Sequence, residues 1–332
     1  MILGEIMKMR PAYGSLVLLS SMLAACGGDG APAGSGSLRV VAAAEDTITG
    51  GIAAGTGEEE IRDGWSVGFE KYIAVLGDID IHLATDEKVE GKDANIFAVD
   101  LAQAPSAGFE LWKLEELPEG RYEFNYWLSG GAHAERHESV SESDFARLEA
   151  DDLSYLISGI LQKTDGVSCP PKSKAAPGGA EPTSTSAAGD DCYENPSITF
   201  EFAVSAETSF GPCEIDGLAG VVISPDKTQT STITIHGDHL FFNGFPEGDE
   251  GGVVRNAQWL ADSDLNVDGK VTREELESLV TADLAALSGI QLGGAPIEID
   301  SVWAYATAQL KTQGHYQGEG ECAVDGKAHS HE

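Results

Sequence analysis

Hydrophobic positions along most of this chain recur in short runs in which every second residue is apolar, the pattern of strands that bury one face. In residues 121–128, aromatic and aliphatic side chains alternate with polar ones throughout the run. Runs of apolar residues separated by Gly, Pro and Asp predict strands at 65–69, 72–76, 79–83, 95–101, 109–114, 121–128, 153–162 and 197–204. Two further runs, 218–223 and 230–236, predict a hairpin-like pair.

Helical periodicity is confined to the C-terminal part of the chain. Residues 253–261, 272–287 and 299–312 carry apolar side chains at three- and four-residue intervals. Long helices between the strands are missing, so the crossovers of a parallel sheet have no candidates. The pattern therefore predicts a mainly β fold: an antiparallel β-sandwich-like domain with a late helical insertion and a C-terminal helix.

Two segments have too few apolar residues to contribute to a core. Residues 26–37 are rich in Gly and Ser and predict a flexible tether. Residues 170–191 are rich in Pro, Ala and Ser and predict a disordered loop. No internal repeat is evident, and residues 38–332 are expected to form one β-rich domain that contains this loop.

The N-terminus has the order of an export signal. Lys8 and Arg10 precede an apolar run of about a dozen residues, which is too short to span a membrane, and Leu23-Ala24-Ala25-Cys26 closes it. This closing sequence resembles the lipobox of bacterial lipoproteins. The resemblance implies a signal peptide over 1–25, lipidation of Cys26 and a cell-envelope protein anchored to a membrane by its N-terminal lipid. Because no Asp follows Cys26 directly, the resemblance favours sorting to the outer membrane.

Four cysteines remain after Cys26, an even number that suits an oxidising compartment and allows three pairings. We favour Cys169 with Cys192, which closes the Pro-rich loop, and Cys213 with Cys322, which ties the C-terminal region to the core. The alternative, a four-cysteine metal site, lacks the C-x-x-C spacing.

The segment from position 264 to 275 offers oxygen ligands at the spacing that calcium requires. The ligands are Asp264, Asn266, Asp268, the Lys270 carbonyl, a water positioned by Thr272, and a bidentate Glu275. This loop resembles the calmodulin-type EF-hand, which implies a helix-loop-helix over 253–287 that binds calcium. No second such loop exists in the chain, so binding in the roughly 10⁻⁴ to 10⁻³ M range and a structural ion are expected.

A second candidate metal site is His236-Gly237-Asp238-His239. On a regular strand His236 and His239 would face opposite ways, but a bend at Gly237 would let them converge on one ion. Imidazole and carboxylate ligands suit zinc or copper, and further donors exist at His315 and in the tail at 329 and 331. An H-x-x-H pair outside a known motif is more often a loop with solvated histidines, so this site is the alternative.

The formal net charge of −35 excludes DNA and RNA as partners, because such a field repels polyanions. Serine-hydrolase, Walker A and dinucleotide motifs are absent, which favours a non-enzymatic protein over an extracellular hydrolase with structural calcium. The sequence thus predicts a calcium-binding cell-envelope lipoprotein, its envelope partner unspecified. The alternative is a periplasmic or surface protein that binds copper or zinc through residues 236–239.

Overall fold

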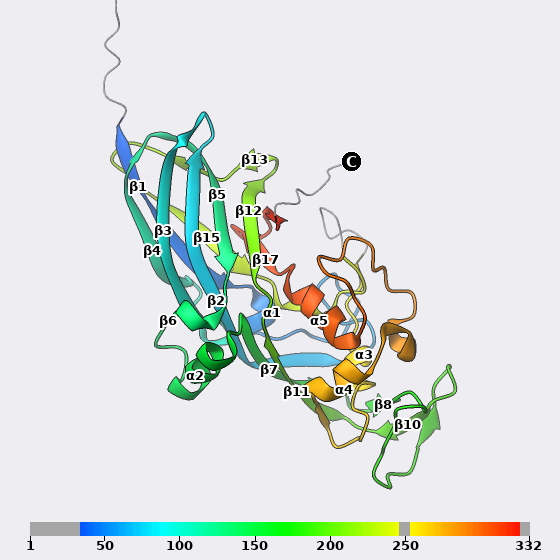
Figure 1. Ribbon diagram of the computed structural model, residues 1–332. Helices are drawn as coiled ribbons and strands as arrows, with labels where there is room; N and C mark the ends of the chain where they lie inside the picture. Colours follow the sequence, from blue (N-terminus) through cyan, green and yellow to red (C-terminus); the bar gives the residue numbers. More distant parts are fainter. Residues whose placement is uncertain (1–33, 246–252, 326–332) are drawn as a thin grey trace, which may run out of the picture. The chain divides into compact units, whose positions relative to one another are not determined.

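The computed structural model describes residues 34–245 and 253–325, so the predicted signal peptide and Cys26 lie outside the described residues. The fold is mainly β, with several sheets in a sandwich-like arrangement and few helices, as the sequence predicted (Figure 1). Across these two ranges, no helix combines the length and the apolar character needed to cross a membrane.

The larger sheet is built around one long strand, β2 (Ser66–Leu83). The sequence predicted three short strands here, but they form one strand whose register shifts between Gly77 and Ile79. Its antiparallel neighbours are β3 (Asp86–Asp100), β5 (Gly120–Leu128) and β7 (Tyr155–Gln162). The sheet continues through β11 (Ser197–Val204), β12 (Thr208–Ile215), β13 (Leu218–Ala219), β14 (Val221–Ile223), β16 (Lys270–Val271) and β18 (Glu321–Val324), with β6 (Glu135–Arg136) beside β3.

The smaller sheet has the order β17 (Gly314–Tyr316), β15 (Thr228–Ile235), β1 (Ser35–Ala44) and β4 (Phe109–Pro118). Strand β1 begins inside the predicted tether and runs parallel to β15, so the sandwich is not purely antiparallel. The predicted hairpin of 218–223 with 230–236 is wrong. Strand β14 pairs with β5, whereas β15 pairs with β1 and β17.

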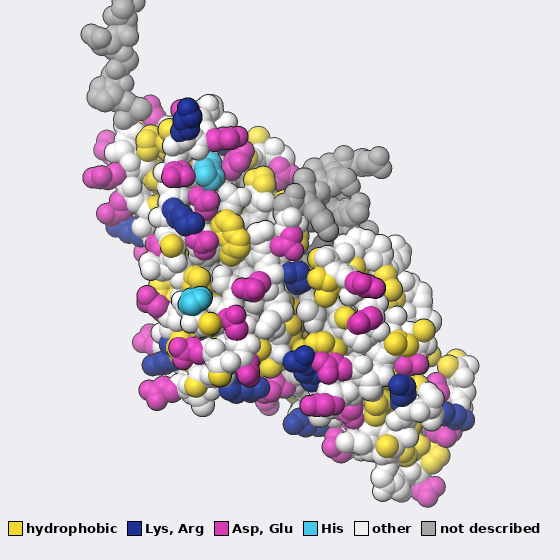
Figure 2. All heavy atoms as spheres, viewed as in Figure 1, with side chains coloured by type: hydrophobic (Ala, Val, Ile, Leu, Met, Phe, Trp, Pro, Cys, Tyr) yellow, Lys and Arg dark blue, Asp and Glu magenta, His cyan; other side chains and the backbone are white. Residues whose placement is uncertain are grey.

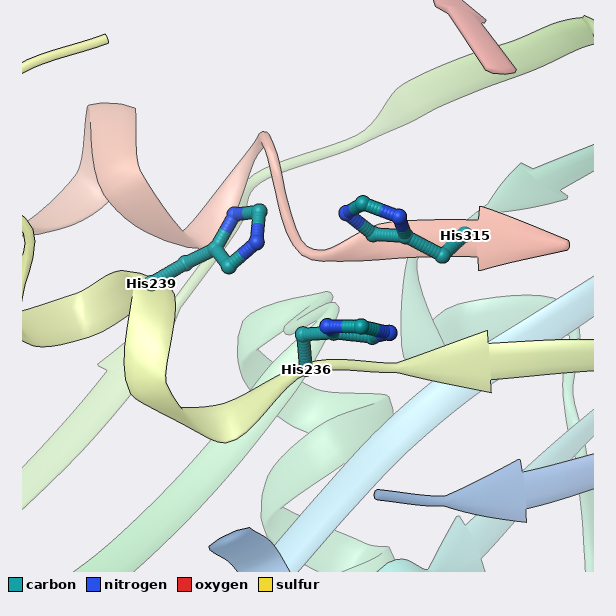
Figure 3. Close-up of side chains that lie close together, drawn as sticks. All are labelled: His236, His239 and His315. Atoms are coloured by element: carbon teal, nitrogen blue, oxygen red, sulfur yellow. The ribbon is translucent and has the colours of Figure 1, made fainter. Parts of the chain in front are cut away.

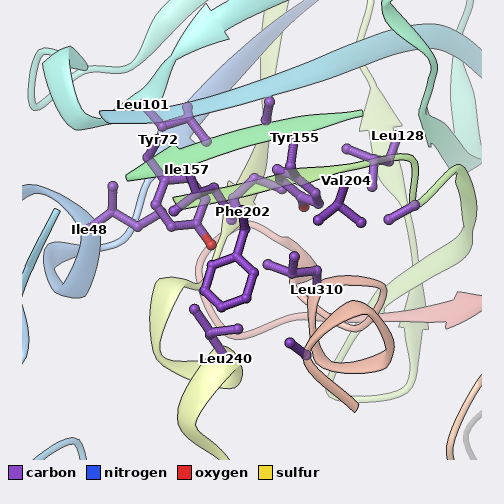
Figure 4. Packing of buried hydrophobic residues seen from close by; sticks show 14 of the residues in the cluster. Ile48, Tyr72, Leu101, Leu128, Tyr155, Ile157, Phe202, Val204, Leu240 and Leu310 are labelled. Atoms are coloured by element: carbon purple, nitrogen blue, oxygen red, sulfur yellow. The ribbon is translucent and has the colours of Figure 1, made fainter. Parts of the chain in front are cut away.

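The main core lies between the two sheets, and β2 contributes to it with alternate residues such as Tyr72, Ala74 and Leu76. The intervening residues Ile73 and Val75 are also buried, in a second cluster that includes Leu148 of α2 (Glu142–Asp151). Strand β2 is therefore covered on both faces. Figure 4 shows part of the main core, where side chains of the large sheet meet Leu240 and Leu310 from segments far along the chain.

Both predicted disulfides are confirmed: Cys169–Cys192 and Cys213–Cys322. The segment 170–191, predicted to be disordered, instead folds back within the first disulfide. Its β9 (Ser184–Thr185) pairs with β10 (Asp191–Glu194), which also pairs with β8 (Val167–Ser168). The backbone amide of Ala176 donates to the carbonyl of Leu265, so this excursion also contacts the candidate calcium loop.

The helical insertion is shorter than predicted. Instead of a helix over 253–261, α3 (Gln258–Ala261) begins late, and the Asp63 carboxylate accepts from the amides of Ala257 and Gln258 at its start. Instead of a helix over 272–287, α4 (Arg273–Ser278) is followed by the 3-10 turns η4 (Thr281–Asp283) and η5 (Ala285–Leu287). The C-terminal helix is confirmed as α5 (Val302–Leu310).

The remaining elements are short and connect the strands. They are α1 (Asp46–Thr49), η1 (Leu101–Gln103), η2 (Gly131–His133) and η3 (Gly237–Phe241). Figure 2 shows Asp and Glu side chains spread over the displayed face with Lys and Arg among them, which agrees with the acidic composition. Among these short elements, η3 follows β15, the strand that lies between β17 and β1 in the small sheet.

Candidate metal centre

Three buried histidines meet where β15 ends and β17 begins. His236 directly follows β15, His239 lies in η3, and His315 lies in β17. Antiparallel pairing places His315 opposite Thr234, and the amide of His236 donates to the Gln313 carbonyl at 3.0 Å. One ligand nitrogen from each imidazole lies within 4.8 Å of the others, and the three rings face a common space (Figure 3). The tail histidines at 329 and 331 lie outside the described residues.

The bend that brings His236 and His239 together is the 3-10 turn η3. A Cβ on Gly237 would lie 2.6 Å from the side chain of Ile48 in α1, so only glycine allows this close approach. Leu240 and Phe241 are fully buried and anchor the turn in the core. The sequence predicted that Gly237 permits a bend; in the structure the turn is present, and glycine is needed there for space beside α1.

The rings pack closely with one another. His236 and His315 stack with their centroids 4.0 Å apart, and His239 meets both edge-on at 5.6 and 5.0 Å. His239 also stacks on Phe242 at 4.3 Å. Aromatic contacts therefore hold the three imidazoles in place from several sides.

Hydrogen bonds assign the tautomers of two of the rings. His236 Nε2 lies 3.1 Å from the Gly318 carbonyl, which only accepts, so Nε2 carries the proton and Nδ1 the lone pair. His239 Nδ1 lies 3.0 Å from the Thr312 hydroxyl, which donates its own proton to the Gln309 carbonyl at 2.8 Å. The hydroxyl must accept from His239, so Nε2 of His239 carries the lone pair. Metal-binding imidazoles are oriented by hydrogen bonds of this kind.

A carboxylate that sequence reasoning missed stands beside these rings. Oε1 of Glu45 is 3.6 Å from His236 Nδ1, and Glu45, His236 and Asp238 form a second group with ligand atoms within 4.8 Å of one another. Burial, together with the nearby charge of Asp238, raises the pKa of Glu45 to about 8, although a hydrogen bond from Thr47 lowers it. No local motif marks Glu45. It follows β1, whose parallel pairing with β15 sets Ala44 opposite Ile235.

Asp238, a predicted ligand, is engaged by a cation. Arg255 donates from Nε to Asp238 Oδ2 at 2.5 Å, and a second guanidinium nitrogen contacts the same oxygen. Both side chains are buried, and the guanidinium also lies over the ring of Phe242 and donates to the Glu58 carbonyl. Asp238 therefore serves first as the partner of Arg255, although one of its oxygens also lies within 4.8 Å of a ligand atom of His236.

In the candidate calcium loop, backbone amides donate to the acidic side chains. The carboxylate of Asp264 accepts from the amides of Asp268 and Gly269, and Gly269 has a φ of 80°. Glu275 accepts from the amides of Leu265 and Thr272. Where a paired EF-hand would contact a second loop, β16 pairs in parallel with β11, with Val271 opposite Phe200.

The side chains of the loop nevertheless do not form a compact ligand cluster. Within the described ranges, both groups of three His, Cys, Asp or Glu ligand atoms that approach within 4.8 Å contain His236, and Asp264, Asp268 and Glu275 form no such group. Asn266 donates its amide to Asp268, and Thr272 caps α4. The Lys270 side chain is exposed, and its amide donates to Asp268.

No family of known proteins is identified for this chain. No protein-family model matches the chain, and no curated protein matches it either. A solved structure described as MbnP from Methylosinus trichosporium is 10% identical, with an alignment that covers 62% of this chain and 77% of that chain. Its TM-score of 0.25 is too low to establish a shared fold.

Proposed function

We propose that this protein binds a transition metal ion, zinc or copper, through His236, His239 and His315. The observation that supports this is the convergence of three buried imidazoles whose ligand nitrogens lie within 4.8 Å of one another. Imidazole nitrogen is a preferred ligand of both metals. The hydrogen bonds of His236 and His239 orient these rings as the outer contacts of a metal site do.

The local charge balance favours a cation. Glu45 and Asp238 are two carboxylates beside His236, and Arg255 pairs with one of them. Moving charged groups out of water costs free energy unless opposite charges compensate them. A divalent ion among the three imidazoles would favour the ionised form of Glu45, whose pKa burial raises to about 8.

Metal analysis tests this proposal directly. Full-length, untagged protein would be stripped with a chelator, dialysed against limiting Zn(II) or Cu(II), and analysed for bound metal by mass spectrometry. Replacing the tail histidines 329 and 331 in every sample removes adventitious binding. We expect one ion per chain in this background and none in the His236→Ala, His239→Ala double variant. The matched control, His82→Ala, removes a histidine that hydrogen-bonds to Asp80 and should retain the ion.

Unchanged metal content in the double variant would refute the proposal, as would the absence of any bound ion in the parent protein. Circular dichroism of each metal-free variant would confirm that the fold is retained. The comparison therefore separates loss of ligands from loss of structure.

We further infer from the lipobox that the protein is anchored to the cell envelope through Cys26. Two disulfides support an oxidising compartment. Mass spectrometry of the mature N-terminus tests the anchor: a diacylglyceryl group on Cys26 is expected, and an unmodified residue 26 would contradict it.

A calcium ion in the loop from 264 to 275 is a second proposed ligand, supported by the backbone hydrogen bonds to Asp264 and Glu275. The variant Glu275→Gln is a sharp test, because Gln preserves the capping box with Thr272 while it removes the bidentate carboxylate. Millimolar calcium should raise the melting temperature of the parent protein and leave that of the variant unchanged. An equal response in both proteins would refute calcium binding by this loop.

A further inference from the structure

We propose that Glu45 is the fourth ligand of the histidine site, and that three imidazoles and one carboxylate make it selective for Cu(II) or Zn(II) over Cu(I). This inference rests on the proposed function and specifies which form of the metal the site takes. It also assigns different tasks to the two acids beside His236.

The tautomer of His236 directs its lone pair toward Glu45. Because Nε2 donates to the Gly318 carbonyl, the ligand atom of His236 is Nδ1, and this atom is 3.6 Å from Glu45 Oε1. Two neighbouring ligands of one tetrahedral ion with bonds of 2.0 to 2.1 Å lie about 3.4 Å apart. Glu45 and His236 are thus already separated by nearly the distance that a shared ion requires.

The backbone and a local hydrogen bond fix the Glu45 carboxylate. The backbone amide of Glu45 donates to the Ile235 carbonyl at 3.1 Å, so Glu45 is hydrogen-bonded to the strand that leads into His236. The Thr47 hydroxyl donates to Oε2 at 2.5 Å and leaves Oε1 toward His236. A ligand whose second oxygen is held in this way is pre-positioned.

Asp238 also has a ligand atom within 4.8 Å of His236, but its carboxylate has a different partner. Its Oδ2 receives two guanidinium contacts from Arg255. Within the part of the chain that the structure describes, no Lys or Arg forms an ion pair with Glu45. The charge of Asp238 is already compensated, whereas that of Glu45 is matched by a bound cation. We therefore assign Glu45 as the ligand and Asp238 as a positioning residue held by Arg255.

The donor atoms determine which oxidation state of copper the site prefers. Cu(I) is selected by thiolates and thioethers, whereas imidazole and carboxylate suit divalent ions. The four cysteines of the described ranges are all in disulfides, and the four methionines of the chain all precede residue 34. No sulfur ligand from the described residues is therefore available to the site.

The test compares Glu45→Gln with the parent protein by competition against chelators: a chromophoric chelator for Zn(II), and bicinchoninate under anaerobic conditions for Cu(I). The matched control is Glu319→Gln, since Glu319 is exposed and acts on Glu45 only through its charge. We expect the affinity for Zn(II) to fall at least about 10- to 100-fold in Glu45→Gln and to remain within about twofold in Glu319→Gln. The affinity for Cu(I) should be unchanged by either substitution.

Cobalt(II) provides a readout of the ligand set itself, because its visible absorption depends on coordination number and donor type. We expect Glu45→Gln to shift the bands of the Co(II)-loaded protein and Glu319→Gln to leave them in place. Zn(II) affinity and Co(II) bands equal to those of the parent in Glu45→Gln would overturn the assignment of Glu45 and leave the three-histidine site standing. A parent protein that binds Cu(I) more tightly than Zn(II) would overturn the selectivity. Failure of the parent to bind any metal would instead overturn the proposed function.

Discussion

Replacing Arg255 by methionine removes the cation that compensates Asp238 beside the candidate metal centre. Arg255 is 6% exposed and Asp238 is fully buried, so water cannot take over the missing contacts. Removing one partner of a buried ion pair typically costs about 3–5 kcal/mol, because the other charge is left uncompensated. The cation–π contact of Arg255 with Phe242 is lost as well. We therefore expect metal-free Arg255→Met to be less stable by about 3–5 kcal/mol.

The magnitude depends on burial, and the chain offers an exposed pair of the same chemistry as a control. Arg147 also contacts a carboxylate with two nitrogens, that of Glu201, but these side chains are 43% and 41% exposed. Exposed pairs contribute about 0.2–1 kcal/mol, so Arg147→Met should cost no more than about 1 kcal/mol.

Urea unfolding followed by circular dichroism would give both values, with a double-mutant cycle that includes Asp238→Asn. We expect the double variant Arg255→Met, Asp238→Asn to lose less stability than the sum of the single variants, by about 2 kcal/mol or more, because the uncompensated charge is gone. Equal losses for Arg255→Met and Arg147→Met, or strictly additive effects in the cycle, would refute the description of Arg255–Asp238 as a buried, coupled pair.

Three further predictions concern the core, the disulfides and pH. Tyr72→Phe removes the donor to the buried amide oxygen of Gln313 (2.6 Å) and should cost about 1–3 kcal/mol in urea unfolding; no measurable loss would contradict that bond. Replacing both cysteines of Cys213–Cys322 by serine should destabilise the protein by about 4.8 kcal/mol, against about 3.4 kcal/mol for Cys169–Cys192, because the first closes the longer loop. The reverse order in unfolding experiments would contradict the loop-closure argument. Protons compete with metal for imidazole, so Zn(II) affinity measured by dialysis should fall at least about tenfold between pH 7.5 and 5.0; a pH-independent affinity would argue against histidine ligands.

The strand pattern predicted much of the fold because most strands bury one face. Strand β11 was predicted with its observed bounds, since its buried and more exposed residues alternate. The sequence did not predict strand β1, because its buried and more exposed residues do not alternate in this way. Its Gly/Ser start resembles the tether, and the run that follows is nearly continuous in apolar residues, which suits a strand placed between β4 and β15.

The helical insertion shows that apolar spacing locates core residues more reliably than it locates helices. Leu279, Leu284 and Leu287 are all buried, as their spacing indicated, yet the chain leaves the helix after Ser278. The Asp283 carboxylate accepts from the amide of Val280 and starts a new turn. Such a local cap competes with helix continuation and is not visible in the hydrophobic pattern.

The candidate metal centre was only half predictable. His236 and His239 are near neighbours in sequence, so their spacing could be interpreted locally. His315 and Glu45 reach the site through the pairing of β15 with β17 and with β1, and strand partners far apart in the chain leave no local signal. The contact of Asp238 with Arg255 also arises from the tertiary fold, so no local pattern in the sequence signals it.

Anomalous diffraction from crystals of the Zn(II)-loaded protein is the most direct test of the metal centre. Data collected on both sides of the zinc absorption edge would locate the ion without assumptions about its ligands. We predict one strong peak among His236, His239 and His315, within about 2.0–2.2 Å of their nitrogens and of a Glu45 oxygen. A fully occupied peak elsewhere with none between these histidines would contradict the account.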